Sequence, residues 1–322
     1  MAKILAVGDL HVVEEELEDC QNLIDGVHKT AQEEEPDFIL FLGDQTNNHK
    51  LFNLEVLRFW KNAFTKLKDF TIVAVVGNHD KPGDASSKAH SMMAFDGLEN
   101  LIIIDQLTFK DGCTFIPYRH DNQDFVNDVL CTTSKVVFCH ATFTGAKFEN
   151  GIYAKDGIDP SQFPDRTFIS GHIHNPHKFG NVYYPGAPRW RTLSDTGTER
   201  SIVLIETDGN TYSVLKEFDT SQWCQKLIHL EDREEAPLDM QLNPRWKYIV
   251  DMYGSEKFIS DRRKVWAGCR LRTFKTQTEL KLVSESMGIP QAIQAFMESY
   301  TSKYGTPSEM LRAAVNRRLF EK

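Results

Sequence analysis

The sequence predicts an α/β fold in which short buried strands alternate with amphipathic helices. Three observations support this prediction. Five short apolar runs have the length and β-branched composition of buried strands. In the first half of the chain such runs alternate with helical patterns, as in α/β sandwiches. Each run leads into Asp, Asn or His, often through a glycine, and ligands of open α/β sheets bind at the carboxyl ends of the strands.

The polar residues that follow these five strands are the candidate site residues. The strands are expected at residues 3–7, 38–42, 71–76, 135–139 and 167–170. Asp-x-His and His-x-His spacings place both side chains on one side of an extended backbone. Five unrelated turn or capping residues would have to coincide to produce this pattern. In chain order, the strands lead to Asp9 and His11, to Asp44, to Gly77-Asn78-His79-Asp80, to His140, and to His172 and His174.

Helical patterns occupy the segments between the strands. Residues 14–35 predict one helix, and residues 51–67 predict a second. The apolar face of the second helix is about 160° wide, against the ~100° of a surface helix. Such a face fits a deeply buried helix, or a helix that packs on its own sheet with one edge and on another subunit with the other. A turn-rich loop at 81–88 and a short helix with Met92, Met93 and Phe95 follow the third strand.

Two later loops combine arginine with aromatic residues. Ile116-Pro117-Tyr118-Arg119 follows two short strands expected within 101–119. Farther on, Pro188-Arg189-Trp190-Arg191 could contact a phosphate backbone and stack on a base. Alternatively, Arg119 is an ordinary surface residue and the second loop is a structural turn with solvated arginines. A hairpin is predicted at 201–217, across Asp208-Gly209-Asn210.

The last third of the chain predicts two smaller parts. A charged stretch at 231–237 ends in proline and indicates a loop or linker. A strand at 246–253, a helix at 258–265 and a strand at 266–271 predict a small α+β unit. From residue 276 the pattern is helical to the end, and the last helix would pack on its own domain or dock on a partner. We therefore expect three parts, at 1–220, 221–275 and 276–322.

Composition narrows the class of protein. With 322 residues, 41% of them hydrophobic, the chain can form real cores. The net charge of −9 argues against a broadly basic surface that coats nucleic acid, although basic residues can be local. No apolar run is long enough for a transmembrane helix and no leader is visible, so we expect no membrane association. Six cysteines without Cys-x-x-Cys spacing favour a reducing cytoplasm.

The set of candidate donors predicts two metal ions. Carboxylate, amide and imidazole donors without thiolates suit Mn, Fe or Zn better than Ca, and Mg poorly. Seven ligands are too many for a single site that keeps an open position. They suit two metals that share a carboxylate, an arrangement used for in-line displacement at phosphorus.

These motifs, in this order, resemble the calcineurin-like metallophosphoesterase superfamily. The resemblance implies a four-layer sandwich of two sheets flanked by helices. It implies that Asp9, His11 and His174 hold one metal and that Asn78, His140 and His172 hold the other, with Asp44 as the bridge. His79 would be the general acid or would stabilise the transition state, Asp80 would orient it, and a water would be the nucleophile.

Within the superfamily, the chain is more similar to the SbcD-type DNA repair nucleases than to protein phosphatases. Protein phosphatases have Gly after the first His and Gly-Asp-x-Val-Asp-Arg-Gly, where this chain has Val12 and Gln45-Thr46-Asn47-Asn48. SbcD-type nucleases, including small phage-encoded forms, share loops like 116–119 and 184–188, a capping domain and a helical C-terminal segment. Val13 stands where that family usually has Gly, and Asn47 where it often has an acidic residue or histidine.

The SbcD resemblance implies a nuclease for DNA repair, recombination and replication. It would act with Mn²⁺, or with Mg²⁺, Fe or Zn, as an exonuclease on duplex ends and an endonuclease on single strands. It implies a homodimer through the helices around 51–67 and 86–97, and an SbcC-type coiled-coil ATPase that binds the C-terminal helices. The small second domain would contact DNA.

The chain has no phosphate-binding loop of its own, so any use of ATP would belong to that partner. We expect it in the cytoplasm, of the host cell if it is phage-encoded. The alternative functions are a phosphodiesterase for small or cyclic nucleotides and a non-catalytic scaffold on the same fold.

Overall fold

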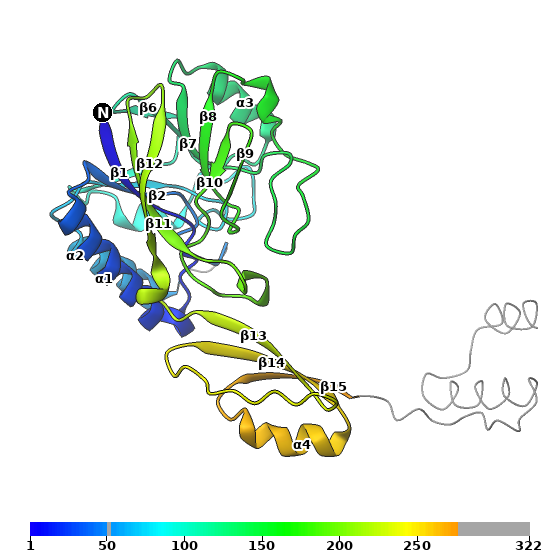
Figure 1. Cartoon of the computed structure of the whole chain (residues 1–322). Helices are drawn as coiled ribbons and strands as arrows, with labels where there is room; N and C mark the ends of the chain where they lie inside the picture. The colour runs from blue at the N-terminus through cyan, green and yellow to red at the C-terminus, as the bar shows by residue number, and fades with distance from the viewer. Residues whose placement is uncertain (50–52, 276–322) are drawn as a thin grey trace, which may run out of the picture. The chain divides into compact units, whose positions relative to one another are not determined.

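The computed structural model describes residues 1–49 and 53–275. They divide into two compact units, Met1–Leu230 with Met240–Ile249, and Glu231–Asp239 with the residues from Val250 onward. Figure 1 shows the course of the chain through both. The C-terminal helices predicted from residue 276 lie outside the described residues.

The first unit contains two mixed sheets of six strands each. One sheet has the order β12-β11-β1-β2-β3-β4, in which β1 to β4 are parallel and β11 with β12 forms the predicted hairpin. Its strands are β1 (Ala2–Val7), β2 (Phe38–Phe41), β3 (Ile72–Val75), β4 (Leu101–Ile104), β11 (Ser201–Thr207) and β12 (Tyr212–Asp219). The other has the order β5-β6-β7-β8-β10-β9. Its strands are β5 (Thr108–Lys110), β6 (Cys113–Ile116), β7 (Val136–His140), β8 (Thr167–Gly171), β9 (His177–Phe179) and β10 (Val182–Tyr184).

The alternation of side chains along the strands builds four layers. Ile4 and Ala6 of β1 lie in the core between the two sheets, whereas Leu5 and Val7 pack against α1 (Leu17–Glu34) and α2 (Leu54–Lys66). The same alternation on β7 divides its side chains between the middle core and a third core shared with α3 (Asn122–Leu130). In Figure 1, α1 and α2 lie on one side of this unit and α3 lies on the opposite side. The predicted α/β sandwich of two sheets flanked by helices is therefore confirmed.

The helices differ in detail from the prediction. The helix expected at 14–35 is a 3₁₀ turn (Glu14–Glu16) followed by α1, and the short helix expected around Met92 is the 3₁₀ helix Ser91–Phe95. Helix α2 starts at Leu54 because the side chain of Asn53 accepts the N–H groups of Glu55 and Val56.

The wide apolar face of α2 is buried within its own unit. Phe59, Trp60 and Phe64 pack into the core shared with α1, while Leu54 at the first turn is 77% exposed. Of the two alternatives for this face, the buried helix accounts for its width. The width alone therefore gives no support to a dimer, which remains a prediction.

The second unit contains the predicted strand–helix–strand sequence. Two of its strands, β13 (Leu227–Arg233) and β14 (Lys247–Gly254), begin in residues of the first unit. They are followed by α4 (Glu256–Val265) and β15 (Arg270–Lys275), and the sheet order is β13-β14-β15. The strand expected at 266–271 begins only at Arg270, because Trp266 is the C-cap of α4. The side chain of Trp266 is buried, and its indole N–H donates to the carboxylate of Asp232. Among the described helices, none is both long and apolar enough to cross a bilayer.

We expect Trp60→Ala to lower the free energy of unfolding by about 3–5 kcal/mol, because the indole is completely buried against Phe41, Phe59 and Phe64. Urea unfolding followed by circular dichroism measures this change. Leu54→Ala, on the same helix but exposed, should stay within about 0.5 kcal/mol of the wild type. Similar losses in both variants would show that the face is not packed as described.

Candidate metal centre

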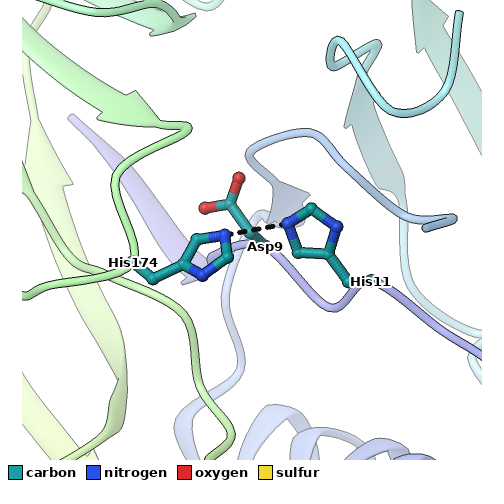
Figure 2. A group of neighbouring side chains, drawn as sticks. All are labelled: Asp9, His11 and His174. Atoms are coloured by element: carbon teal, nitrogen blue, oxygen red, sulfur yellow. Dashed lines mark hydrogen bonds between the residues drawn. The ribbon is translucent and has the colours of Figure 1, made fainter. Parts of the chain in front are cut away.

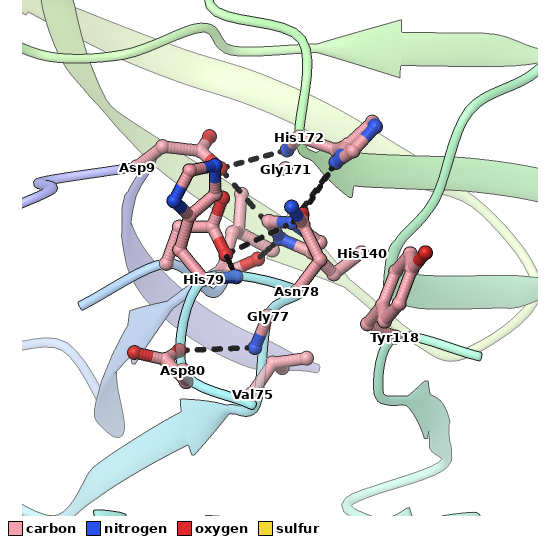
Figure 3. A network of polar contacts seen from close by, with 12 residues as sticks. Asp9, Val75, Gly77, Asn78, His79, Asp80, Tyr118, His140, Gly171 and His172 are labelled. Carbon is pink, nitrogen blue, oxygen red and sulfur yellow. Dashed lines mark hydrogen bonds and ion pairs between the residues drawn. The ribbon is translucent and has the colours of Figure 1, made fainter. Parts of the chain in front are cut away.

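All seven predicted metal ligands lie together where the two sheets of the first unit meet. Strands β1, β2 and β3 of one sheet and β7 and β8 of the other point their carboxyl ends to this place. Figure 3 shows the part of the network around Asp9, Asn78, His140 and His172. The five strand ends therefore form one cluster, as predicted. They belong to two different sheets, β1, β2 and β3 to one and β7 and β8 to the other.

Glycines give the ligands their room. A Cβ added to Gly43 would come within 2.1 Å of Nδ1 of His140, and one added to Gly77 within 2.2 Å of Oδ1 of Asp44. Gly43 also has a positive φ of 113°, which L-residues with side chains rarely adopt. The sequence therefore needs glycine at these strand ends because any side chain would fill the space around the ligands.

Asp9, His11 and His174 form one half of the cluster, which we call half-set 1 (Figure 2). Nε2 of His11 lies 2.8 Å from Nε2 of His174. Oδ1 of Asp9 accepts the backbone N–H of His172 at 2.8 Å, whereas Oδ2 is buried without a hydrogen-bond partner among the described residues. Burial lowers the pKa of His11 well below its usual value, so its ring is uncharged and can offer a nitrogen lone pair to a metal ion.

Asn78, His140 and His172 form the other half, half-set 2. Oδ1 of Asn78 lies 2.9 Å from Nε2 of His140 and 2.7 Å from Nδ1 of His172. Nδ1 of His140 contacts the carbonyl oxygen of Leu42 at 2.8 Å, so this nitrogen carries a proton and Nε2 is the atom that faces the cluster and would bind a metal ion. Burial and the nearby His140 lower the pKa of His172 to about 3.

Asp44 lies between the two half-sets. Its Oδ2 is 3.4 Å from Nε2 of His11, and its Oδ1 is 3.4 Å from Nε2 of His140. Burial opposes the charge of the carboxylate, yet the neighbouring His140 and His11 hold its pKa well below the usual range. Asp44 thus presents one oxygen to each half-set.

The electrostatics of the cluster favour a cation at its centre. Burial works against a charged ring, but the carboxylates of Asp44 and Asp9 raise the pKa of His140 to about 9. A positive charge is therefore stabilised here. Oδ2 of Asp9 is buried and has no hydrogen-bond partner among the described residues. The possible ligand atoms of Asp9, His11 and His174 lie within 4.8 Å of one another, and so do those of Asp44, His140 and His172. This set of oxygen and nitrogen ligands fits divalent metal ions.

His79 lies beside the cluster, with an orientation that differs from the prediction. Its Nδ1 contacts the carbonyl oxygen of Asn47 at 3.0 Å, and its backbone N–H donates to Oδ1 of Asp44 at 2.8 Å. The carboxylate of Asp80 instead accepts the backbone N–H groups of Gly77 and Thr46. The expectation that Asp80 orients the ring of His79 is therefore wrong, because Asp80 holds two strand-end loops together and Asn47 orients the ring.

Two neighbours of the cluster were missed from the sequence. His49 lies over His79, with ring centroids 4.2 Å apart, and its Nδ1 contacts the carbonyl oxygen of Asn78 at 2.9 Å. Glu149 accepts the backbone N–H of His174 at 2.7 Å. Neither follows a strand directly, so the strand-end pattern could not reveal them. The short distance in sequence from Asp44 was the only available signal for His49.

The arginine-rich loop lies largely inside the protein. Arg189 is 1% exposed and pairs with Asp19 at 3.1 Å and Glu16 at 3.2 Å, and Trp190 donates its indole N–H to the carbonyl oxygen of Thr198. These two side chains are not available to DNA in this structure, which corrects the expectation for them. Arg191 is partly exposed and reaches Oδ1 of Asn47, and Arg119 is partly exposed and pairs with Asp128.

A family model, a viral protein and a bacterial structure match parts of this chain. The sequence model of the calcineurin-like phosphoesterase family, Metallophos, matches residues 2–196. The "Putative phosphoesterase 078R" of Invertebrate iridescent virus 3 is 26% identical over 201 residues, which cover 57% of this chain and 56% of that protein. The chain thus spans about half the length of this relative. The solved structure of Yfce, a phosphoesterase from E. coli, is 14% identical and aligns over 67% of this chain and 98% of its own, with a TM-score of 0.33, too low to bear on function.

We expect Gly77→Ala to weaken Mn²⁺ binding by about 10–100-fold, the range seen when the partners that orient metal ligands are removed, because the added methyl group would displace the Asp44 carboxylate. Calorimetric titration of chelator-stripped protein measures the affinity. Gly83→Ala is the matched control, because nothing lies within 4 Å of its added Cβ. An unchanged affinity in Gly77→Ala would show that metal does not bind at Asp44.

Proposed function

The chain belongs to the calcineurin-like phosphoesterase family, and we propose that it is a two-metal DNA nuclease of the SbcD type, which hydrolyses phosphodiester bonds at duplex ends and in single strands. The observation that carries the proposal is the position of Asp44, with one carboxylate oxygen facing His11 and the other facing His140. A carboxylate shared between two half-sets of ligands suits a pair of metal ions at the distance used for displacement at phosphorus.

The seven ligands would hold the metal ions in two groups. Asp9, His11 and His174 would hold one ion, Asn78, His140 and His172 the other, and Asp44 would contact both. Mn²⁺ is the proposed metal, with Mg²⁺, Fe or Zn as alternatives. When bound, the ions would neutralise the phosphate oxygens and lower the pKa of an attacking water.

The chain's own residues would position and protonate the leaving group. The contact of Nδ1 of His79 with the carbonyl oxygen of Asn47 places a proton on Nδ1 and leaves Nε2 for the substrate. In its protonated form the ring would donate from Nε2 to the leaving oxygen. The bond from its backbone N–H to Asp44 and the ring of His49 over it restrict the movement of His79.

Local basic residues favour DNA over a small nucleotide. Residues 262–275 contain six Lys or Arg and no Asp or Glu, although the whole chain has a net charge of −9. Arg263, Lys264 and Arg270 are exposed and have no ion-pair partner within the described part of the chain. A small-nucleotide phosphodiesterase would not need such a unit, so we assign these residues, with Arg119 and Arg191, to DNA contacts.

The assembly follows the SbcD resemblance. We propose that residues 276–322 bind an SbcC-type coiled-coil ATPase, that two copies of the chain pair through 51–67 and 86–97, and that the complex works in the cytoplasm. Six free thiols support a reducing compartment. The first two statements rest on the resemblance alone.

Incubation with end-labelled duplex and single-stranded DNA in Mn²⁺, with and without chelator, tests the function. We expect cleavage that the chelator abolishes. Hydrolysis of a chromogenic phosphodiester or a cyclic nucleotide without any action on DNA would instead support the small-nucleotide alternative, and no hydrolysis at all would support the scaffold.

We expect His79→Ala to lower kcat by about 10²–10⁴-fold, the usual contribution of a general acid, while two Mn²⁺ ions still bind. Single-turnover cleavage and metal content should be measured on the same preparation. His28→Ala is the control, since this half-buried histidine of α1 lies outside the cluster, with its ring against Phe70. Cleavage at the wild-type rate would remove His79 from the mechanism.

A further inference from the structure

A small pocket opens beside half-set 2, on the side of His172. Its volume is ≈ 90 Å³. A space this small favours a base with one ring, a pyrimidine, over a purine with its two fused rings. One wall is the imidazole of His172, a proposed metal ligand, so an occupant would lie next to the phosphate bound at the metal centre.

Tyr118 supplies the aromatic wall of this pocket. Its ring is nearly parallel to the ring of His172, at 23° and a centroid distance of 6.1 Å, and Figure 3 shows it beside His140 and His172. The ring is partly exposed, and its hydroxyl has no hydrogen-bond partner among the residues described. An aromatic ring with free surface beside a metal site can take a base in a stack.

Two backbone bonds hold Tyr118 to the metal-binding segment. Its N–H donates to the carbonyl oxygen of Val76 at 2.9 Å, and its carbonyl oxygen accepts from Nζ of Lys81 at 3.2 Å. Val76 and Lys81 flank the Gly77-Asn78-His79-Asp80 segment directly. The ring thus comes from the loop after β6 in one sheet and is fixed to the end of β3 in the other.

The rest of the lining combines an apolar floor with polar groups at the rim. Phe125 and Ile158 are buried beneath the pocket. Nε of Arg119 donates a hydrogen bond to Oδ2 of Asp128 at 2.7 Å. The terminal N–H groups of Arg119 have no partner in the described part of the chain. An aromatic wall, an apolar floor and hydrogen-bond donors at the rim are complementary to the faces and the carbonyl oxygens of a pyrimidine.

We propose that this pocket, formed by Tyr118, Arg119 and His172, binds the base of the nucleotide next to the phosphodiester at the metal centre. The inference rests on the proposed function and extends it, because it assigns specificity for a nucleoside to a defined place. A base can enter only when it is unpaired, so the reacting nucleotide must leave the duplex.

Equilibrium binding tests the pocket without turnover. Mn²⁺-loaded protein is titrated with thymidine 5′-monophosphate and with inorganic phosphate, and the ratio of the two affinities reports the contribution of the nucleoside. We expect a ratio well above one in the wild type and a fall of about tenfold in Tyr118→Ala, as expected when a base loses an aromatic partner. Tyr118→Phe should keep the ratio.

Controls separate binding from folding. Phe109→Ala removes an exposed aromatic ring from β5 of the same sheet, outside the pocket, and should keep the wild-type ratio. Thermal unfolding and metal content are measured for every variant. If Tyr118→Ala does not fold, the ratio in Arg119→Ala, which should also fall, decides the question.

Three outcomes decide the proposal. A ratio of one in the wild type would overturn it, and so would an equal loss of both affinities in Tyr118→Ala, which would make the ring a packing partner of His172. A ratio above one that depends on Tyr118 supports the pocket, even if the protein hydrolyses no phosphodiester. In that last case the proposed function alone would fail.

Discussion

The concentration of two carboxylates and four imidazoles in one buried space is the constraint on which the rest of the structure depends. Asp9 and Asp44 are almost completely buried, and burial alone would disfavour their charges. The cluster is compatible with folding only if positive charge is placed between them. Without metal, a proton on His140 can supply part of it, and its high pKa reflects this demand. Divalent cations supply more charge at the same place, so metal binding and stability of the native state should be coupled.

Three residues of the cluster have a strained backbone conformation. His11, Asp44 and His172 have positive φ angles of 47°, 52° and 87°, in a region that residues with side chains avoid. Each such residue costs on the order of 1–3 kcal/mol and persists only where its surroundings enforce it. Here the enforcing contacts are two hydrogen bonds: the N–H of His11 donates to the carbonyl oxygen of Asp44, and the N–H of His172 donates to the carboxylate of Asp9. The ligands therefore hold one another in place across the two sheets.

Several residues that look functional in the sequence hold these loops instead. The carboxylate of Asp80 accepts backbone N–H groups from two strand ends, and Arg189 joins Glu16, Asp19 and the carbonyl oxygen of Leu10 beneath half-set 1. A charged residue beside a metal site is thus ambiguous in sequence. Removing either would leave buried polar groups without partners, so loss of activity on mutation would not by itself show a role in the chemistry.

The sequence by itself determined the strands, the α/β class and the identity of the clustered residues, because short continuous apolar runs and the polar residues at their ends are local patterns. Only the tertiary structure decided that the five ends belong to two sheets, that Asn47 rather than Asp80 orients His79, and that Arg189 and Trp190 are buried while His49, Glu149 and Tyr118 border the site. These contacts join residues far apart in the chain, and nothing in a local pattern records which distant backbone group or ring a side chain will meet.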